Sequence, residues 1–156
     1  MRWPTQVRLI LPGKIKFPFV KEGALFYQKR LRNYFPFSLE EKKTPKAKDS
    51  FLVKEKEGEV LLKAASSASL IIALDERGKT FDSLSFARIW ERFLEEEREI
   101  ALLIGGPFGL SEKVLKEADL KLSLSSFTLG HEIALLVLLE QLYRAATILT
   151  GEPYHK

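Results

Sequence analysis

The chain has 156 residues and no cysteine, which excludes disulfides and thiolate metal sites and fits one domain over residues 1–156. Neither a signal peptide nor a run of about 20 apolar residues is visible, so we expect a soluble, cytoplasmic protein without a membrane segment. The net charge of +4 is uneven: residues 1–63 hold 15 Lys/Arg and 7 Asp/Glu, whereas residues 64–156 hold 10 and 14. The basic half favours a polyanionic partner, although a solvated basic surface explains the charge equally well.

In the first half of the chain, short β-rich runs alternate with amphipathic stretches. The patterns predict strands over residues 7–11 and 37–41, helices over residues 21–34 and 50–65, and a charged loop over residues 40–48. Pro12-Gly13 ends the first strand, and Gly58 weakens the second helix because glycine is a poor helix former.

The second half has the pattern of three buried strands separated by helices. Continuous apolar runs predict strands over residues 70–74, 100–104 and 120–124. Helices are expected after caps at Asp82 or Ser83 and at Ser111, and a last one over residues 131–149. This alternation indicates an α/β fold with a mainly parallel sheet and helices on both faces. The last helix is apolar nearly all round, which predicts cover on both sides and, most simply, a subunit interface.

Three strand-to-loop junctions of the second half are the expected ligand site, because ligands of parallel sheets bind beyond the carboxyl ends of the strands. The junctions are residues 74–78, 105–109 and 124–130. The Gly105–Gly109 loop lets a ligand approach the backbone or is simply a tight turn, and it lacks the G-x-G-x-x-G dinucleotide pattern. The last junction, rich in Ser and Thr, could hold an adenine or a ribose through main-chain hydrogen bonds, or be a plain polar loop. Asp75 and Glu76 could bind a ribose or simply be solvated charges in a turn, and the sequence favours neither.

The two histidines, His131 and His155, offer little support for other chemistry. Neither belongs to a cluster with metal-ligand spacing, so no metal site is predicted. The sequence has no G-x-S-x-G elbow and no Ser/His/Asp series, which argues against a hydrolase.

Five ordered motifs carry a family resemblance: Ala73–Lys79, Ile104–Leu110, Leu122–Ser125 with Thr128 and His131, Glu140–Ala145, and Gly151–Lys156. With Gly13-Lys14 and Lys54–Gly58, they resemble the ribosomal RNA large subunit methyltransferase H family of the SPOUT class over nearly the whole chain. The resemblance implies a C-terminal trefoil knot, a homodimer and bound S-adenosyl-L-methionine. It also implies methylation of N3 of a pseudouridine in helix 69 of large-subunit ribosomal RNA, in the free RNA, the large ribosomal subunit or the assembled ribosome.

The resemblance assigns the cofactor to the three junctions already singled out, at Leu74, Gly105, Leu124, Ser125, Ser126, Phe127, Thr128 and Leu129. In the C-terminal tail, Tyr154 and His155 are the expected catalytic residues, His155 to accept a proton and Tyr154 to stack or donate. RNA contacts are expected at His131 and Arg144, with an interface salt bridge as the alternative for Arg144. Further phosphate contacts are expected from the basic half, at Lys14, Lys16, Lys29, Arg30 and Arg32.

Three departures from the family pattern leave alternatives open. Relatives usually have Pro, Gln and Arg where this chain has Gly130, Glu132 and Leu135. The lost cation and the added negative charge predict weaker RNA positioning at this spot. A second hypothesis is therefore a ribosome- or RNA-binding protein that keeps the fold without methyltransferase activity. A third is a generic nucleotide-binding α/β enzyme, which would bind a dinucleotide instead.

Overall fold

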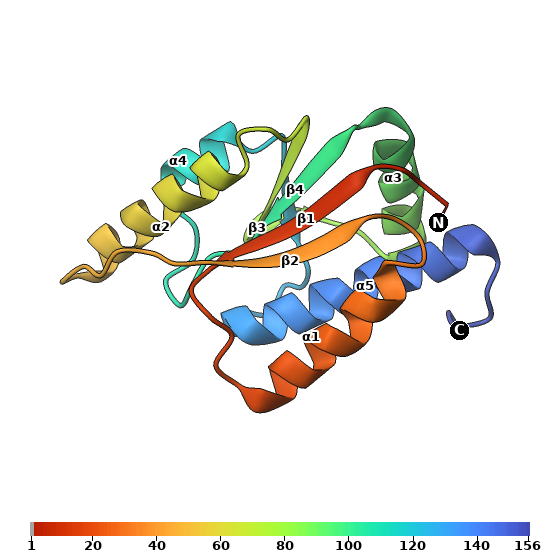
Figure 1. Ribbon diagram of the computed structural model, residues 1–156, viewed down its shortest axis with the longest axis horizontal. Helices are drawn as coiled ribbons and strands as arrows, with labels where there is room; N and C mark the ends of the chain where they lie inside the picture. Colours follow the sequence, from red (N-terminus) through yellow and green to blue (C-terminus); the bar gives the residue numbers. More distant parts are fainter. Residues whose placement is uncertain (1) are drawn as a thin grey trace.

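A sheet of five parallel strands forms the centre of the molecule (Figure 1). The computed structural model describes residues 2–156. The strands are β1 (Gln6–Pro12), β2 (Phe37–Lys42), β3 (Leu70–Thr80), β4 (Glu99–Leu103) and β5 (Leu120–Ser123), in the spatial order β2-β1-β4-β3-β5. All four pairings are parallel, which confirms the predicted α/β fold. Because β4 lies between β1 and β3 and is covered on both faces, its run Ile100–Leu103 is apolar throughout.

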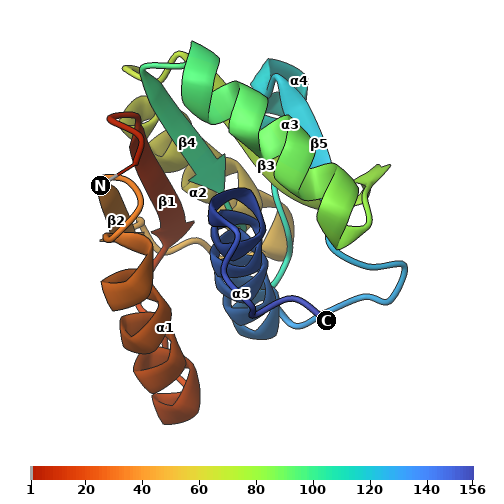
Figure 2. The same ribbon diagram turned by 90° about the vertical axis from the view of Figure 1, so that its right-hand side faces the viewer.

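Helices cover both faces of the sheet, as Figures 1 and 2 show. One face packs against α1 (Pro18–Leu31), α3 (Ser83–Glu96) and α5 (His131–Thr150), around the larger of two hydrophobic clusters. The other face packs against α2 (Ser50–Ala64) and α4 (Glu112–Glu117) around the smaller cluster. The side chains of Asp82 and Ser111 cap α3 and α4 as the sequence predicts.

Two elements differ from their predicted bounds by more than one residue. Helix α1 begins at Pro18, three residues before the predicted start, because proline suits the first turn of a helix, and it ends at Leu31 rather than Tyr34. Strand β3 does not end at Leu74 but continues to Thr80 through an irregularity, since both Leu74 and Lys79 pair with Leu122. The predicted junction after Leu74 is therefore a bulge within one strand.

Helix α5 is a core helix. By length and composition it could cross a membrane, but it packs between α1 and α3 on the sheet, and Leu135, Leu138, Leu139 and Leu142 are fully covered. Ile133 near its start remains 37% exposed, so part of the cover that the sequence predicts is missing in one chain. The trefoil knot that the resemblance implies for this end of the chain stays a prediction.

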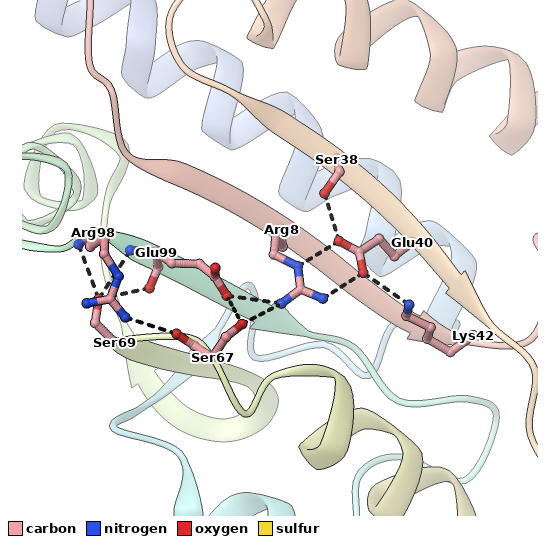
Figure 3. A network of polar contacts seen from close by, with 8 residues as sticks. All are labelled: Arg8, Ser38, Glu40, Lys42, Ser67, Ser69, Arg98 and Glu99. Atoms are coloured by element: carbon pink, nitrogen blue, oxygen red, sulfur yellow. Dashed lines mark hydrogen bonds and ion pairs between the residues drawn. The ribbon is translucent and has the colours of Figure 1, made fainter.

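A polar network joins β1, β2 and β4 on the α2 side of the sheet (Figure 3). The Arg8 guanidinium donates to both carboxylate oxygens of Glu40, at 2.7 and 2.8 Å, and to Glu99 at 3.0 Å. The Glu40 carboxylate also accepts from the Ser38 hydroxyl at 2.8 Å and pairs with Lys42 at 3.3 Å. The Arg8 guanidinium holds the pKa of Glu40 at about 2, below its usual 4.5. The network therefore ties three neighbouring strands together.

Candidate active site

A cavity of about 800 Å³ opens at the carboxyl ends of β4 and β5 and beside the bulge that follows Leu74 in β3. Parts of all three predicted junctions line it, namely residues 74–77, residues 105–109, and residues 124, 125 and 127–130. They meet because β3 lies between β4 and β5 in the sheet, so its bulge lies beside the segments that leave the ends of β4 and β5. Among the predicted cofactor residues Leu74, Gly105, Leu124, Ser125, Phe127, Thr128 and Leu129 line the cavity, and Ser126 does not.

The glycine loop after β4 is closed too tightly for side chains at its start. A Cβ at Gly105 would lie 2.5 Å from the carbonyl carbon of Gly109, so only glycine fits there. Gly109 has a φ of +82°, and its main-chain N–H donates to the carbonyl of Gly106 at 3.0 Å. The loop thus presents bare backbone to the cavity, which suits a ligand held by main-chain groups.

The 124–130 segment is ordered by its own hydroxyl groups. The Ser123 hydroxyl donates to the carbonyl of Ser125 at 3.0 Å, and the Ser125 hydroxyl accepts from the N–H of Phe127 at 2.9 Å. The Thr128 hydroxyl donates to the Glu76 carboxylate at 2.6 Å and so ties this segment to the β3 bulge. Two of the three cavity walls are therefore linked directly.

The floor of the cavity is apolar and its rim is charged. Leu74, Ile104, Leu122, Leu124 and Leu129 provide the apolar surface. At the rim, Arg77 pairs with Asp75 at 3.3 Å and lies 3.8 Å from Glu112. An apolar slot edged by main-chain amides and a few polar side chains is typical of a site for a flat heterocycle.

His131 and Glu132 connect the cavity with the β1–α1 loop. His131 lines the cavity, and burial lowers its pKa below the usual 6.5, although the neighbouring Glu132 opposes this shift. The buried Glu132 carboxylate accepts from the main-chain N–H groups of Lys16 and Phe17, at 2.8 and 3.0 Å. Glu132 is thus used inside the protein, and the negative charge expected to disturb RNA positioning is compensated by two donors.

The family of this chain follows from its similarity to known proteins. Residues 5–155 match the family described as "Predicted SPOUT methyltransferase". The chain belongs to the SPOUT methyltransferases. It is 40% identical over 153 residues to the "Ribosomal RNA large subunit methyltransferase H" of Syntrophotalea carbinolica, covering 96% of this chain and 98% of that protein. The protein of that name from Clostridium botulinum (strain Kyoto / Type A2) is 43% identical over 157 residues, covering 96% and 99%.

A solved structure supports the same fold. The probable methylase family protein of Haemophilus influenzae Rd KW20 superposes with a TM-score of 0.61 at 15% identity, covering 97% of this chain and 71% of that one. The family resemblance drawn from the motifs is therefore confirmed, and so is the SPOUT-type α/β fold.

The tail residues lie away from the cavity of this SPOUT chain. Residues 152–155 fold back along α5, where the Tyr154 hydroxyl donates to Glu140 at 2.7 Å and Arg144 contacts the His155 Nδ1 atom at 3.0 Å. Arg144 also pairs with Glu140 at 2.8 Å. Only His131 and Ala134 of α5 line the cavity, and Glu140 lies six residues beyond Ala134, about 9 Å along the helix. One chain does not bring Tyr154, His155 or Arg144 to its own cavity.

Lys14 and Lys16 lie on the segment between β1 and α1, where the Lys16 main chain contacts Glu132. Phe108, within the predicted Gly105–Gly109 junction, lines the cavity. The sequence reasoning missed Lys54, which also lines it, and Glu57, which lies behind it in contact with Gly106. Lys54 and Glu57 belong to the Lys54–Gly58 motif, which already marked this part of α2. Their position at the cavity could not be predicted from the sequence, because it depends on α2 packing beside the glycine loop.

Proposed function

We propose that the chain transfers a methyl group from S-adenosylmethionine to N3 of a pseudouridine in helix 69 of large-subunit ribosomal RNA. The observation that carries the proposal is the convergence of three junctions on one cavity, together with relatives named ribosomal RNA large subunit methyltransferase H. Those relatives match over nearly the whole chain, cavity segments included.

The residues of the cavity fit S-adenosylmethionine. Leu74, Leu124 and Leu129 offer apolar surface for an adenine, and the bare backbone at Gly105 offers room and main-chain groups for the polar parts. When bound, the cofactor supplies an electrophilic methyl group on a sulfonium. The protein then has to hold the target base in line and exclude water, and both depend on the closeness of the surrounding loops.

The contacts of the tail support a role for His155 and Tyr154 in stabilising the anion that forms when N3 loses its proton. Because arginine only donates, its contact with His155 Nδ1 leaves Nε2 as the protonated nitrogen of a neutral ring. His155 would then donate a hydrogen bond to a carbonyl oxygen of the base, and the N3 proton would pass to solvent water rather than to His155. Burial and the bond to Glu140 raise the pKa of Tyr154, which keeps it a neutral donor.

A homodimer would bring the tail of one copy to the cavity of the other, because one chain keeps them apart. Exposed apolar side chains just before and along α1 and at the start of α5 support such an interface, among them Phe17, Phe19, Phe26 and Ile133. Mixing a Gly105→Trp variant with a Tyr154→Ala/His155→Ala variant should then restore about a quarter of the wild-type activity. Two variants that stay inactive after mixing would contradict a shared site.

Methylation itself is tested on ribosomes from a strain that lacks the gene. Added protein and S-adenosylmethionine should increase the mass of one fragment from helix 69 by one methyl group, located by mass spectrometry. Unchanged mass with intact RNA binding would favour the non-enzymatic alternative. That alternative rested mainly on Leu135, which packs fully covered in the main core and does not line the cavity.

A further inference from the structure

Glu57 is a buried carboxylate that the proposed reaction does not use. It lies in the middle of α2, its side chain is only 8% exposed, and its Oε1 atom has no hydrogen-bond partner within residues 2–156. No lysine or arginine of this described part of the chain forms an ion pair with it. Burying a carboxylate without a cation costs free energy, so a structural or functional gain has to offset that cost.

The carboxylate lies against the glycine loop. A Cβ placed at Gly106 would meet the Oε2 and Oε1 atoms of Glu57 at 2.8 and 3.0 Å. Burial raises the pKa of Glu57, while the Gly106 main-chain N–H, which approaches the carboxylate, acts in the opposite direction. Gly106 also lines the cavity. Glu57 therefore touches a wall of the proposed cofactor site without entering the site.

The next residue of α2, Gly58, contacts Ser111, which follows the glycine loop in the sequence. Gly58 lies so close to the buried Ser111 that a Cβ there would collide with the Ser111 hydroxyl. Ser111 in turn caps α4 by accepting from the N–H of Val114 at 3.3 Å. Two successive residues of α2 thus contact both ends of the 106–111 segment.

We propose that Glu57 is a positioning residue that fixes the Gly105–Gly109 loop and thereby sets the affinity for S-adenosylmethionine. The proposal rests on the proposed function, because it takes that nucleoside as the ligand. Glu57 acts through Gly106 and touches neither ligand nor reacting atoms. Glycine is required at position 106 because the Glu57 carboxylate fills the space that a side chain would take.

Calorimetric titration with S-adenosylmethionine tests the proposal on the full-length protein. Glu57→Ala should weaken cofactor binding on the order of tenfold, because the loop loses the carboxylate that packs against Gly106. Glu57→Gln keeps the size and one acceptor oxygen and should stay within about threefold of wild type. Glu59→Ala, on the exposed side of α2, is the matched control and should bind as wild type. With saturating cofactor, the turnover of Glu57→Ala should recover, since only the loop is displaced.

A double-mutant cycle separates loop positioning from general damage. Gly106→Ala alone should weaken binding by displacing the carboxylate, and in the Glu57→Ala background the same change should cost much less. Wild-type affinity in Glu57→Ala, or fully additive effects in the cycle, would overturn the inference. If Glu57→Ala does not fold by circular dichroism, Glu57→Asp replaces it, since the shorter side chain withdraws the carboxylate from Gly106. Failure of the wild-type protein to bind S-adenosylmethionine would instead sink the proposed function.

Discussion

Acid should destabilise this protein through one carboxylate, Glu40, in the network around Arg8. The pKa of Glu40 is about 2 in the folded chain and 4.5 without the network. Because the folded-state pKa is depressed, the stabilisation is complete above pH 4.5 and is lost as the pH falls towards 2. With about 1.4 kcal/mol for each pKa unit, the full effect is about 3 kcal/mol, of which about 2 kcal/mol should be lost between pH 6 and pH 3.

The assay is urea unfolding of wild type and Glu40→Gln at pH 6 and pH 3. Other carboxylates titrate in both proteins, so the difference between the two pH dependences isolates Glu40. Wild type should lose about 2 kcal/mol more than Glu40→Gln over this interval. Glu59→Gln, at an exposed position, should behave as wild type. An equal loss in wild type and Glu40→Gln would refute the argument, because it would mean that Arg8 does not hold the charged form of Glu40 in solution.

Three further predictions concern helix packing, RNA binding and pH. Gly58→Ala should lower the melting temperature, although alanine in a helix normally gains about 1 kcal/mol, and adding Ser111→Gly should restore part of the loss. The triple variant K43Q/K46Q/K48Q removes three exposed lysines before α2 and should reduce the slope of log K against log salt concentration, for binding of an rRNA stem-loop, by about 2 to 3. The control variant K113Q/K116Q should leave this slope unchanged. Because burial depresses the pKa of His131, stability should fall as the pH drops below 6.5, and urea unfolding of His131→Asn should show a smaller fall.

The buried elements could be predicted from the sequence because their signal is local. The fourth strand was expected over residues 100–104 and is observed at Glu99–Leu103, and the last helix was expected over residues 131–149 and is observed at His131–Thr150. The prediction for β3 was wrong after Leu74, because charged residues and a glycine mark a turn equally in a loop and in a bulge.

The location of the site could also be predicted, but not its composition. That ligands bind beyond the ends of parallel strands follows from the fold class, and this sufficed to select the three junctions. Strand order is a property of the whole sheet, so the sequence did not show that β3 lies between β4 and β5. Glu57 was missed for a related reason: within Lys54–Gly58 it looks like one more exposed charge, and only packing against the glycine loop buries it.

The geometry of α5 explains why its first turn lines the cavity while the C-terminal tail lies elsewhere on the chain. The helix has 20 residues and spans about 30 Å; its first turn lines the cavity, whereas the tail folds back only as far as Glu140 in its middle. The tail is held along the helix by Glu140 and Arg144, and the Tyr34 hydroxyl donates a further hydrogen bond to the Glu152 carboxylate of the tail. These contacts fix Tyr154 and His155 at a defined position on the surface of one chain. A tail fixed in this way is better suited to meet a second copy than to reach back to its own cavity.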